Sequence, residues 1–250
     1  MKRQWLTSNK RTNMVNKLLS VAYYLYRGEK KDFKGDLESA YFLGFIYRNL
    51  ISFIRGFINF RRSKVLIGVG ENVIIRCASK FKFLGNSMIH DSCYIDAYSK
   101  NGIVFGSKVS IGKNTHIECS GSIHHKGEGL SIGNNTGVGS FGFLGCAGGV
   151  KIGNDTIMGN FVSFHSENHN FSDLDIPIRL QGVNHQGIKI GNNCWIGSKV
   201  TILDGVNIED GCIIAAGAVV KAGTYKKNGI YGGVPAKFLK SRSDGKNSEK

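Results

Sequence analysis

The sequence predicts a mainly β protein built as a parallel β-helix, in which short strands and tight corners alternate every six residues. Three observations predict this fold. Aliphatic residues recur at every sixth position, and this period continues on both sides of one long interruption. Glycine is abundant, with 34 residues, whereas proline occurs only 2 times. Many glycines with few prolines suit tight turns whose backbone N–H groups are still needed for pairing.

The six-residue period is clearest from residue 190 onward, and earlier blocks keep the same phase. An α-helix has 3.6 residues per turn and would scatter such positions around its surface. Three six-residue units instead close a triangular coil, and successive coils stack at the strand spacing of about 4.8 Å. The residues predicted to point into this prism are Ile89, Ile95, Ile111, Ile117, Ile123, Ile132, Val138, Leu144, Ile152, Met158, Phe164, Ile190, Ile196, Ile202, Ile208, Ile214 and Val220.

The net charge of +15 is concentrated at the two ends of the chain. Residues 1–62 hold 13 Lys/Arg against 4 Asp/Glu, and residues 237–250 hold 5 against 2. Positive charge spread over the whole protein would suggest a nucleic-acid partner, whereas charge confined to the ends points elsewhere. We therefore expect no nucleic-acid partner, and expect the ends to be solvated or to meet a membrane surface.

The six cysteines are scattered and form no C-x-x-C pair. This spacing predicts neither a zinc site nor a disulfide framework, and favours reduced, mostly buried thiols in a cytoplasmic protein. The N-terminus MKRQWLTSNK lacks the apolar segment of a signal peptide.

We divide the chain into a helical, basic N-terminal extension (1–62), a β-helix domain (63–236) and a basic C-terminal tail (237–250), polar after Ser241. Helical spacing is present from Met14 to Leu25 and from Tyr41 to Phe60. Charged residues interrupt the second stretch, which disfavours a membrane-spanning helix. We expect it to cap the open end of the solenoid or to lie in a membrane interface as a peripheral contact.

The period is interrupted at residues 165–188, and an interruption of this length predicts a functional loop. The loop contains three histidines, His165, His169 and His185, together with Glu167. Histidine suits general-base work because its ordinary pKa of about 6.5 lies near the operating pH. Glu167 could orient such a histidine, or be an ordinary exposed carboxylate.

The motif Ile190-Gly-Asn-Asn-Cys-Trp-Ile196-Gly resembles the hexapeptide-repeat acyltransferases, and the resemblance covers residues 65–236. It implies a left-handed parallel β-helix and a homotrimer with sites between neighbouring prisms. In the sugar O-acetyltransferases of that family the catalytic histidine lies at the start of the extruded loop. The matching residue here is His169, whereas His165 falls where a corner should be and is expected to pack.

The segment after the loop resembles the family's coenzyme A region. The resemblance implies that acetyl-CoA is the donor, with Trp195 lining its groove and small residues admitting the pantetheine arm. Cations would meet the phosphates. A buried packing role is the alternative for Trp195, and solvated side chains are the alternative for the lysines. The implied donor-site residues are Trp195, Ser198, Ala216, Gly217, Lys221, Lys237 and Lys240.

Two departures from the family pattern affect the details. Lys221-Ala222 stands where Thr-Lys is common, and residues 137–147 lack the carboxylate that often contacts the acceptor. The leading hypothesis is transfer of an acetyl group from acetyl-CoA to a hydroxyl of a sugar or glycan precursor, without a metal. Rivals within the class are N-acetylation of an amino-sugar nucleotide and serine O-acetylation. Rivals outside it are a noncatalytic β-solenoid and a gamma-carbonic-anhydrase-like metalloenzyme, whose ligands would be His165, His169 and one of His116, His124 and His125.

Overall fold

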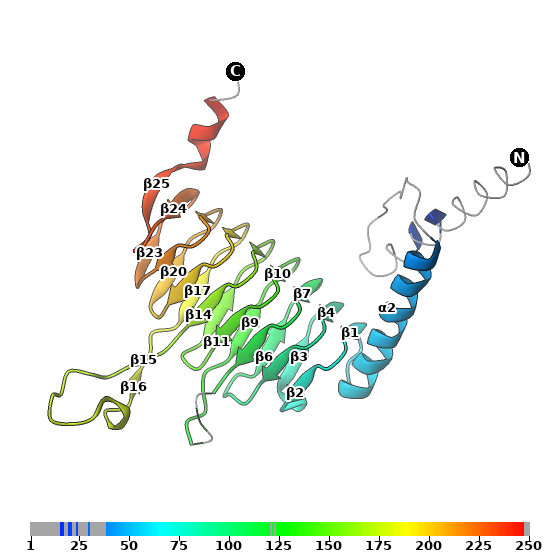
Figure 1. Ribbon diagram of the computed structural model, residues 1–250, viewed down its shortest axis with the longest axis horizontal. Coiled ribbons are helices and arrows are strands. Elements are labelled where there is room, and N and C mark those ends of the chain that lie inside the picture. Colours follow the sequence, from blue (N-terminus) through cyan, green and yellow to red (C-terminus); the bar gives the residue numbers. More distant parts are fainter. Residues whose placement is uncertain are drawn as a thin grey trace, which may run out of the picture.

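The computed structural model describes residues 39–120, 122 and 124–247, together with residues 16, 17, 20, 21, 24 and 30. In these ranges the chain forms a left-handed parallel β-helix, whose three sheets are the faces of a triangular prism, with a long helix at one end (Figure 1). The predicted β-helix is confirmed. Most of the helix predicted over residues 14–25, and Ile123, lie outside the described residues.

Successive strands pass in turn to the three faces, which we name sheets A, B and C, and each strand pairs in parallel with the strand one coil away. Sheet A contains β1 (Ile67–Val69), β4 (Ser87–Ile89), β7 (Val109–Ile111), β10 (Gly137–Val138), β13 (Ile157–Met158), β18 (Trp195–Ile196), β21 (Ile213–Ile214), β24 (Gly229–Gly232) and the antiparallel β25 (Lys237–Ser241). Sheet B contains β2 (Ile74–Arg76), β5 (Tyr94–Asp96), β8 (His116–Glu118), β11 (Phe143–Gly145), β14 (Ser163–His165), β19 (Thr201–Leu203) and β22 (Val219–Val220). Sheet C contains β3 (Phe81–Phe83), β6 (Ile103–Phe105), β9 (Leu130–Ile132), β12 (Val150–Ile152), β17 (Ile188–Ile190), β20 (Val206–Ile208) and β23 (Gly223–Tyr225). The remaining elements are α2 (Ser39–Asn59), the hairpin strands β15 (Asn168–His169) and β16 (Val183–Asn184), and the 3-10 helices η1 (Ala78–Lys80), η2 (Ile178–Leu180) and η3 (Arg242–Asn247).

The repeat Ile-Gly-Asn-Asn explains how one corner forms. Ile190 points into the prism and is 4% exposed. Gly191 is required because a Cβ there would lie 2.7 Å from the backbone nitrogen of Asp210 in the next coil. The Asn192 side chain accepts a 2.8 Å hydrogen bond from the Asn154 N–H of the preceding coil. Asn193 turns the corner with φ of 54°, a left-handed conformation that asparagine tolerates better than most residues.

The core is the interior of the prism. Every predicted inward-pointing residue that the structure describes is buried, from Ile89 to Val220. Buried threonine hydroxyls at the corners tie adjacent coils together. Thr136, for example, donates 2.8 Å to the Gly153 carbonyl, and Thr156 donates 3.1 Å to that of Gly191. The six-residue period therefore encodes both the apolar core and its polar corners.

Aromatic side chains close both ends of the prism. At the N-terminal end, Phe60 follows α2 and packs against Phe81 and Phe83 with ring centroids 5.2 and 4.8 Å apart. At the other end, Tyr225 and Tyr231 meet edge to face at 5.0 Å. The expected capping role of the Tyr41–Phe60 stretch agrees with this packing. No helix in the described ranges has the length and apolarity needed to cross a membrane.

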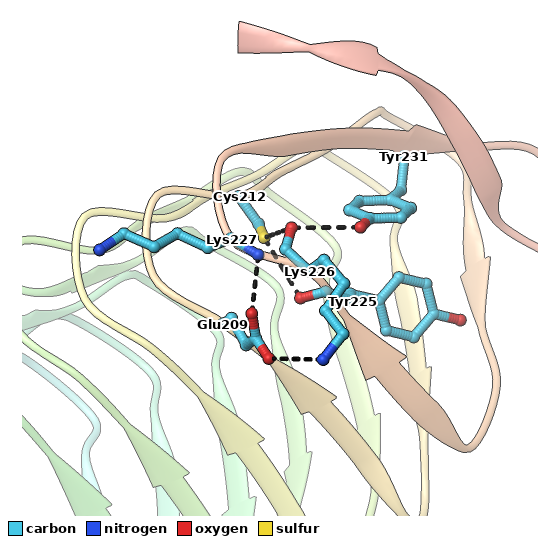
Figure 2. Close-up of polar contacts among 6 residues, drawn as sticks. All are labelled: Glu209, Cys212, Tyr225, Lys226, Lys227 and Tyr231. Atoms are coloured by element: carbon cyan, nitrogen blue, oxygen red, sulfur yellow. Dashed lines mark hydrogen bonds and ion pairs between the residues drawn. The ribbon is translucent and has the colours of Figure 1, made fainter.

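The last corner is held by a cluster of polar contacts (Figure 2). Glu209 accepts from the Lys226 ammonium at 3.2 Å and from the Lys227 N–H at 2.9 Å. The Tyr231 hydroxyl donates 3.1 Å to the Lys226 carbonyl, and the Cys212 thiol donates to the same oxygen at 3.1 Å. Burial raises the pKa of the Cys212 thiol to about 11.

The first residues of the basic tail expected over 237–250 are part of the folded prism. Residues 237–241 form β25, which pairs with β24 and covers the free edge of sheet A. Arg242 then donates 2.8 Å to the Gly211 carbonyl. The exposed edge of the last coil explains the difference, because unpaired backbone groups favour the addition of a strand.

Candidate active site

The extruded loop leaves the prism at the corner between sheets B and C. The strand register holds through His165, which pairs with Leu203 of the next coil and belongs to β14. The loop therefore runs over residues 166–187, one residue shorter at each end than the sequence indicates, and β17 resumes the coil. In Figure 1 the extruded loop, with β15 and β16, forms an arm that projects from one edge of the prism.

A second connection at the same corner was missed by the sequence interpretation. β8 ends at Glu118 and β9 begins at Leu130, so the connection between the two strands takes residues 119–129. The coil above turns this corner within residues 146–149. The six-residue spacing in the sequence gave no sign of this longer connection. The salt bridge between Lys100 and Glu128, with 2.6 Å between nitrogen and oxygen, ties its return to the corner below.

The extruded loop has its own hydrogen-bond framework. Asn168 and His169 of β15 pair with Asn184 and Val183 of β16 as a short antiparallel ladder. At the distal end, the Gln181 amide donates 2.7 Å to the Asp173 carbonyl and 2.6 Å to that of Ile176. These bonds give the loop one defined conformation although most of its residues are exposed.

Asp204, buried at 3% exposure, joins both legs of the loop to the prism. Its carboxylate accepts hydrogen bonds from the Gln186 N–H at 2.9 Å and the Gly187 N–H at 2.7 Å, both on the returning leg. It also accepts from the Asn168 amide on the outgoing leg at 3.3 Å. The sequence interpretation did not identify Asp204. Asp204 follows β19, one coil after the start of the loop, so its contact with the loop can be recognised only once the coils are stacked.

His169 lies on β15, next to the residue that Asp204 holds. Because successive side chains of a strand point to opposite sides, His169 points away from the Asn168–Asp204 contact. Its side chain is exposed and Glu167 is half-buried. In the described ranges no hydrogen bond or ion pair joins Glu167 to His169. The structure thus makes the predicted base accessible, but does not bring the predicted orienting carboxylate into contact with it.

The other histidines near this corner have separate environments. His165 stacks against Phe143 with ring centroids 5.4 Å apart, and burial lowers its pKa. On the same face, His116 lies 3.1 Å from the Glu118 carboxylate. His185 packs over Gly148, where a Cβ would be 2.5 Å from the His185 Cβ. His165 therefore lies in a strand, against Phe143, rather than at the corner that the sequence suggested.

A cleft of about 420 Å³ lies where the two extruded connections meet the outer face of sheet C. Glu128, Gln186, Lys151 and Lys189 contribute its polar lining. The hydrogen bond from Lys100 lowers the pKa of Glu128. His169 is not among the residues that line this cleft.

Most of the predicted donor-site residues lie on sheet A and its corner with sheet B. Trp195 is 53% exposed on the outer face of β18, so the buried alternative for Trp195 is wrong. It pairs with Ile213, which pairs with Ile230, which pairs with Lys240. Three strand spacings thus separate Trp195 from Lys240, about 14 Å. We call this row, Trp195, Ile213, Ile230 and Lys240, the sheet A row.

The small residues stack beside this row. The Gly217 N–H donates 2.9 Å to the Ser198 carbonyl, and the Gly197 position allows close approach to Ala216. Lys237 pairs with Gly232 at the end of the sheet. Lys221, by contrast, follows β22 at the corner between sheets B and C, so the structure separates it from the other six donor-site residues.

The base and the donor row lie on opposite sides of one prism. The loop leaves from the corner between sheets B and C, and sheet A is the face opposite that corner. One copy of the chain therefore does not bring His169 and Trp195 together. In the described residues, no group of three His, Cys, Asp or Glu side chains is arranged to hold a metal ion.

Comparisons with known proteins identify the repeat. The model of the bacterial transferase hexapeptide family (six repeats) matches residues 187–222, from the end of the loop past β22. A probable acetyltransferase of Mycobacterium tuberculosis is 29% identical over 100 residues, which cover 40% of this chain and 33% of the relative. The chain thus matches about a third of that relative's length. The hexapeptide repeat is thus recognised over residues 187–222, and the predicted resemblance to hexapeptide-repeat acyltransferases is confirmed.

Solved structures of lower sequence identity also overlap with this chain. A hexapeptide-repeat acetyltransferase of Vibrio cholerae, complexed with acetyl coenzyme A, is 24% identical over 54% of this chain and 69% of its own, with a TM-score of 0.45. A maltose O-acetyltransferase of Clostridium difficile is 17% identical over 94% of this chain and 87% of its own, with a TM-score of 0.40. An N-acyltransferase of Bacillus cereus, with bound sugar nucleotide and coenzyme A, is 19% identical over 72% of this chain and 82% of its own, with a TM-score of 0.46. Overlaps at these scores do not bear on activity.

Proposed function

We propose that the chain transfers an acetyl group from acetyl-CoA to a hydroxyl of a sugar or glycan precursor, with His169 as general base. The observation that carries the proposal is the loop itself. It interrupts a hexapeptide coil, presents an accessible histidine, and is clamped at both legs by the buried Asp204 carboxylate. The matched repeat begins directly behind it.

In the proposed reaction His169 takes the proton from the acceptor hydroxyl as its oxygen attacks the thioester carbonyl carbon. Backbone N–H groups stabilise the resulting oxyanion. The carbon–sulfur bond then breaks, and the leaving thiolate takes the proton back from His169 to give free coenzyme A. Asp204 serves as a positioning residue, since it touches the loop rather than the reacting atoms.

The sheet A row supports the donor site. The pantetheine arm is an extended chain with amide groups, and it suits an apolar strip bordered by small residues. Trp195, Ile213 and Ile230 supply such a strip, and Lys237 and Lys240 at its end supply cations for phosphates. The separate position of Lys221 removes support for its phosphate role.

The opposite placement of base and donor row supports a homotrimer. We propose that the loop of one copy reaches the sheet A row of the next, so that each site is shared between two prisms. Closed rings are the ordinary outcome of such a head-to-tail interface. We further propose a cytoplasmic enzyme, in keeping with thiols that are free in all six cases and buried in five.

The test is release of coenzyme A thiol in the presence of a panel of sugars and glycan precursors. His169→Ala should lower turnover by roughly 10² to 10⁴ with its unfolding temperature unchanged. His125→Ala, in the other extruded connection, is the matched control and should retain activity. Full activity of His169→Ala would refute the assignment of the base.

The same assay separates the alternatives. Turnover with an amino-sugar nucleotide but no hydroxyl acceptor would favour N-acetylation, and turnover with serine would favour serine O-acetylation. Absence of any coenzyme A binding would favour a noncatalytic solenoid. A stoichiometric metal in the purified protein, lost on replacement of His165 or His169, would favour the metalloenzyme.

A further inference from the structure

The side of α2 that faces away from the prism is apolar. A helix has 3.6 residues per turn, so positions 46, 50, 54 and 57 lie on one stripe, with 47 and 58 beside it. None of these positions is charged. The members of this outer stripe are Ile46, Tyr47, Leu50, Ile54, Phe57 and Ile58, which are between 36% and 70% exposed.

Packing on the opposite side fixes this orientation. Ser52 and Gly56 are buried, and a Cβ on Gly56 would overlap the Ile67 carbonyl of β1. Phe53 lies against Gly68 in the same strand, close to Met88. The helix therefore cannot roll to bury its outer stripe without losing its contact with the first coil. An amphipathic surface helix normally exposes its polar face, whereas α2 exposes this apolar stripe.

The charge around this stripe has one sign. Residues 39–64 contain five basic side chains, Arg48, Arg55, Arg61, Arg62 and Lys64, and no acidic one. Arg48 and Arg55 flank the stripe on one side, and Arg61, Arg62 and Lys64 follow the helix and are exposed. Two copies that met through this stripe would bring ten cations together with no acidic side chain from these segments to offset them.

We propose that the outer stripe of α2 docks on an anionic lipid bilayer, with the helix lying in the plane of the membrane surface. Its 21 residues span about 31 Å at 1.5 Å per residue. The apolar stripe enters the boundary between headgroups and acyl chains, and the flanking cations meet anionic headgroups. The inference does not depend on the proposed acetyl transfer.

The test is co-sedimentation of the full chain with vesicles of phosphatidylcholine alone or mixed with phosphatidylglycerol. We expect binding to the anionic vesicles that weakens with salt. Leu50→Ser with Phe57→Ser should weaken it by about tenfold or more, because both side chains lose apolar burial. The control, Phe171→Ser with Leu174→Ser, alters side chains that are 71% and 95% exposed on the extruded loop, and should bind like the wild type.

Charge provides a second variant. Arg61→Gln with Arg62→Gln should weaken binding to the anionic vesicles about fivefold per arginine and leave the weak binding to neutral vesicles unchanged. Absence of wild-type binding to anionic vesicles, or equal binding of the Leu50/Phe57 variant, would overturn the proposal.

Two further outcomes would identify a different occupant. A smaller oligomer of the Leu50/Phe57 variant than of the wild type in light scattering would mean that a second copy covers the stripe.

A polarity-sensitive dye can be attached to Leu50→Cys in a Cys77→Ser background. Its fluorescence emission should shift to the blue only when vesicles are added. A dye that is already blue-shifted in a vesicle-free sample would mean that protein covers the stripe, and would equally overturn the proposal.

Discussion

Replacement of Asp204 by alanine should release the extruded loop while leaving the prism folded. The buried carboxylate accepts from the N–H groups of Gln186 and Gly187 and from the Asn168 amide. A hydrogen bond to a charged group contributes about 1.5–3 kcal/mol. Loss of the two short backbone bonds alone therefore destabilises the docked loop by about 3 kcal/mol or more, which corresponds to an opening equilibrium raised about a hundredfold.

Hydrogen exchange measures this opening directly. The amides of Gln186 and Gly187 should exchange about a hundredfold faster in Asp204→Ala, whereas amides of β12 and β19 should keep their protection. Asp210→Ala is the matched control, since Asp210 also accepts a backbone hydrogen bond from the preceding coil, at 2.7 Å from the Asn192 N–H, but lies at another corner. Unchanged exchange at Gln186 and Gly187 in Asp204→Ala would refute the clamp.

Three further predictions follow from the coils and their side chains. Gly153→Ala should destabilise the fold by about 1–3 kcal/mol in urea unfolding, because its Cβ would lie 2.6 Å from the next coil. Gly137→Ala is the control and should be neutral, because a Cβ at Gly137 meets nothing within 4 Å. Equal effects of the two substitutions would contradict the close stacking of the coils. In the native protein only Cys77 should react with a thiol reagent, because the other five cysteines are buried; rapid reaction of a second thiol would argue against the packed core. Burial lowers the pKa of His165, so the unfolded chain binds more protons as the pH falls through about 6.5 and stability decreases there. His165→Gln should flatten this part of the stability–pH profile, and an unaltered profile would contradict the lowered pKa of His165.

The sequence predicted the core well because the six-residue period depends on local geometry alone. Each residue from Ile190 to Val220 that keeps the phase faces inward, whatever the neighbouring coils contain. The same period located the extruded loop to within one residue at each end, since β14 and β17 resume the pattern on either side. The period gave no sign of the longer connection between β8 and β9, which only the stacking of the coils reveals.

The site was less predictable because its contacts join residues that are distant in the chain. Asp204 meets Asn168 across 36 positions, and only the stacking of coils reveals it. Likewise, Trp195 and Lys240 share a row because β25 folds back on β24. The sequence pattern placed Lys221 beside the other donor-site residues, whereas the triangular path of the coil carries it to another corner.

Calorimetric titration of acetyl-CoA into the full chain measures the proposed donor site itself. We expect micromolar binding that is lost in Trp195→Ala and retained in Leu84→Ala, which removes a side chain of similar exposure, 59% against 53%, in an early coil. An absence of binding to the wild type, or equal binding by Trp195→Ala, would contradict the proposed donor site on sheet A.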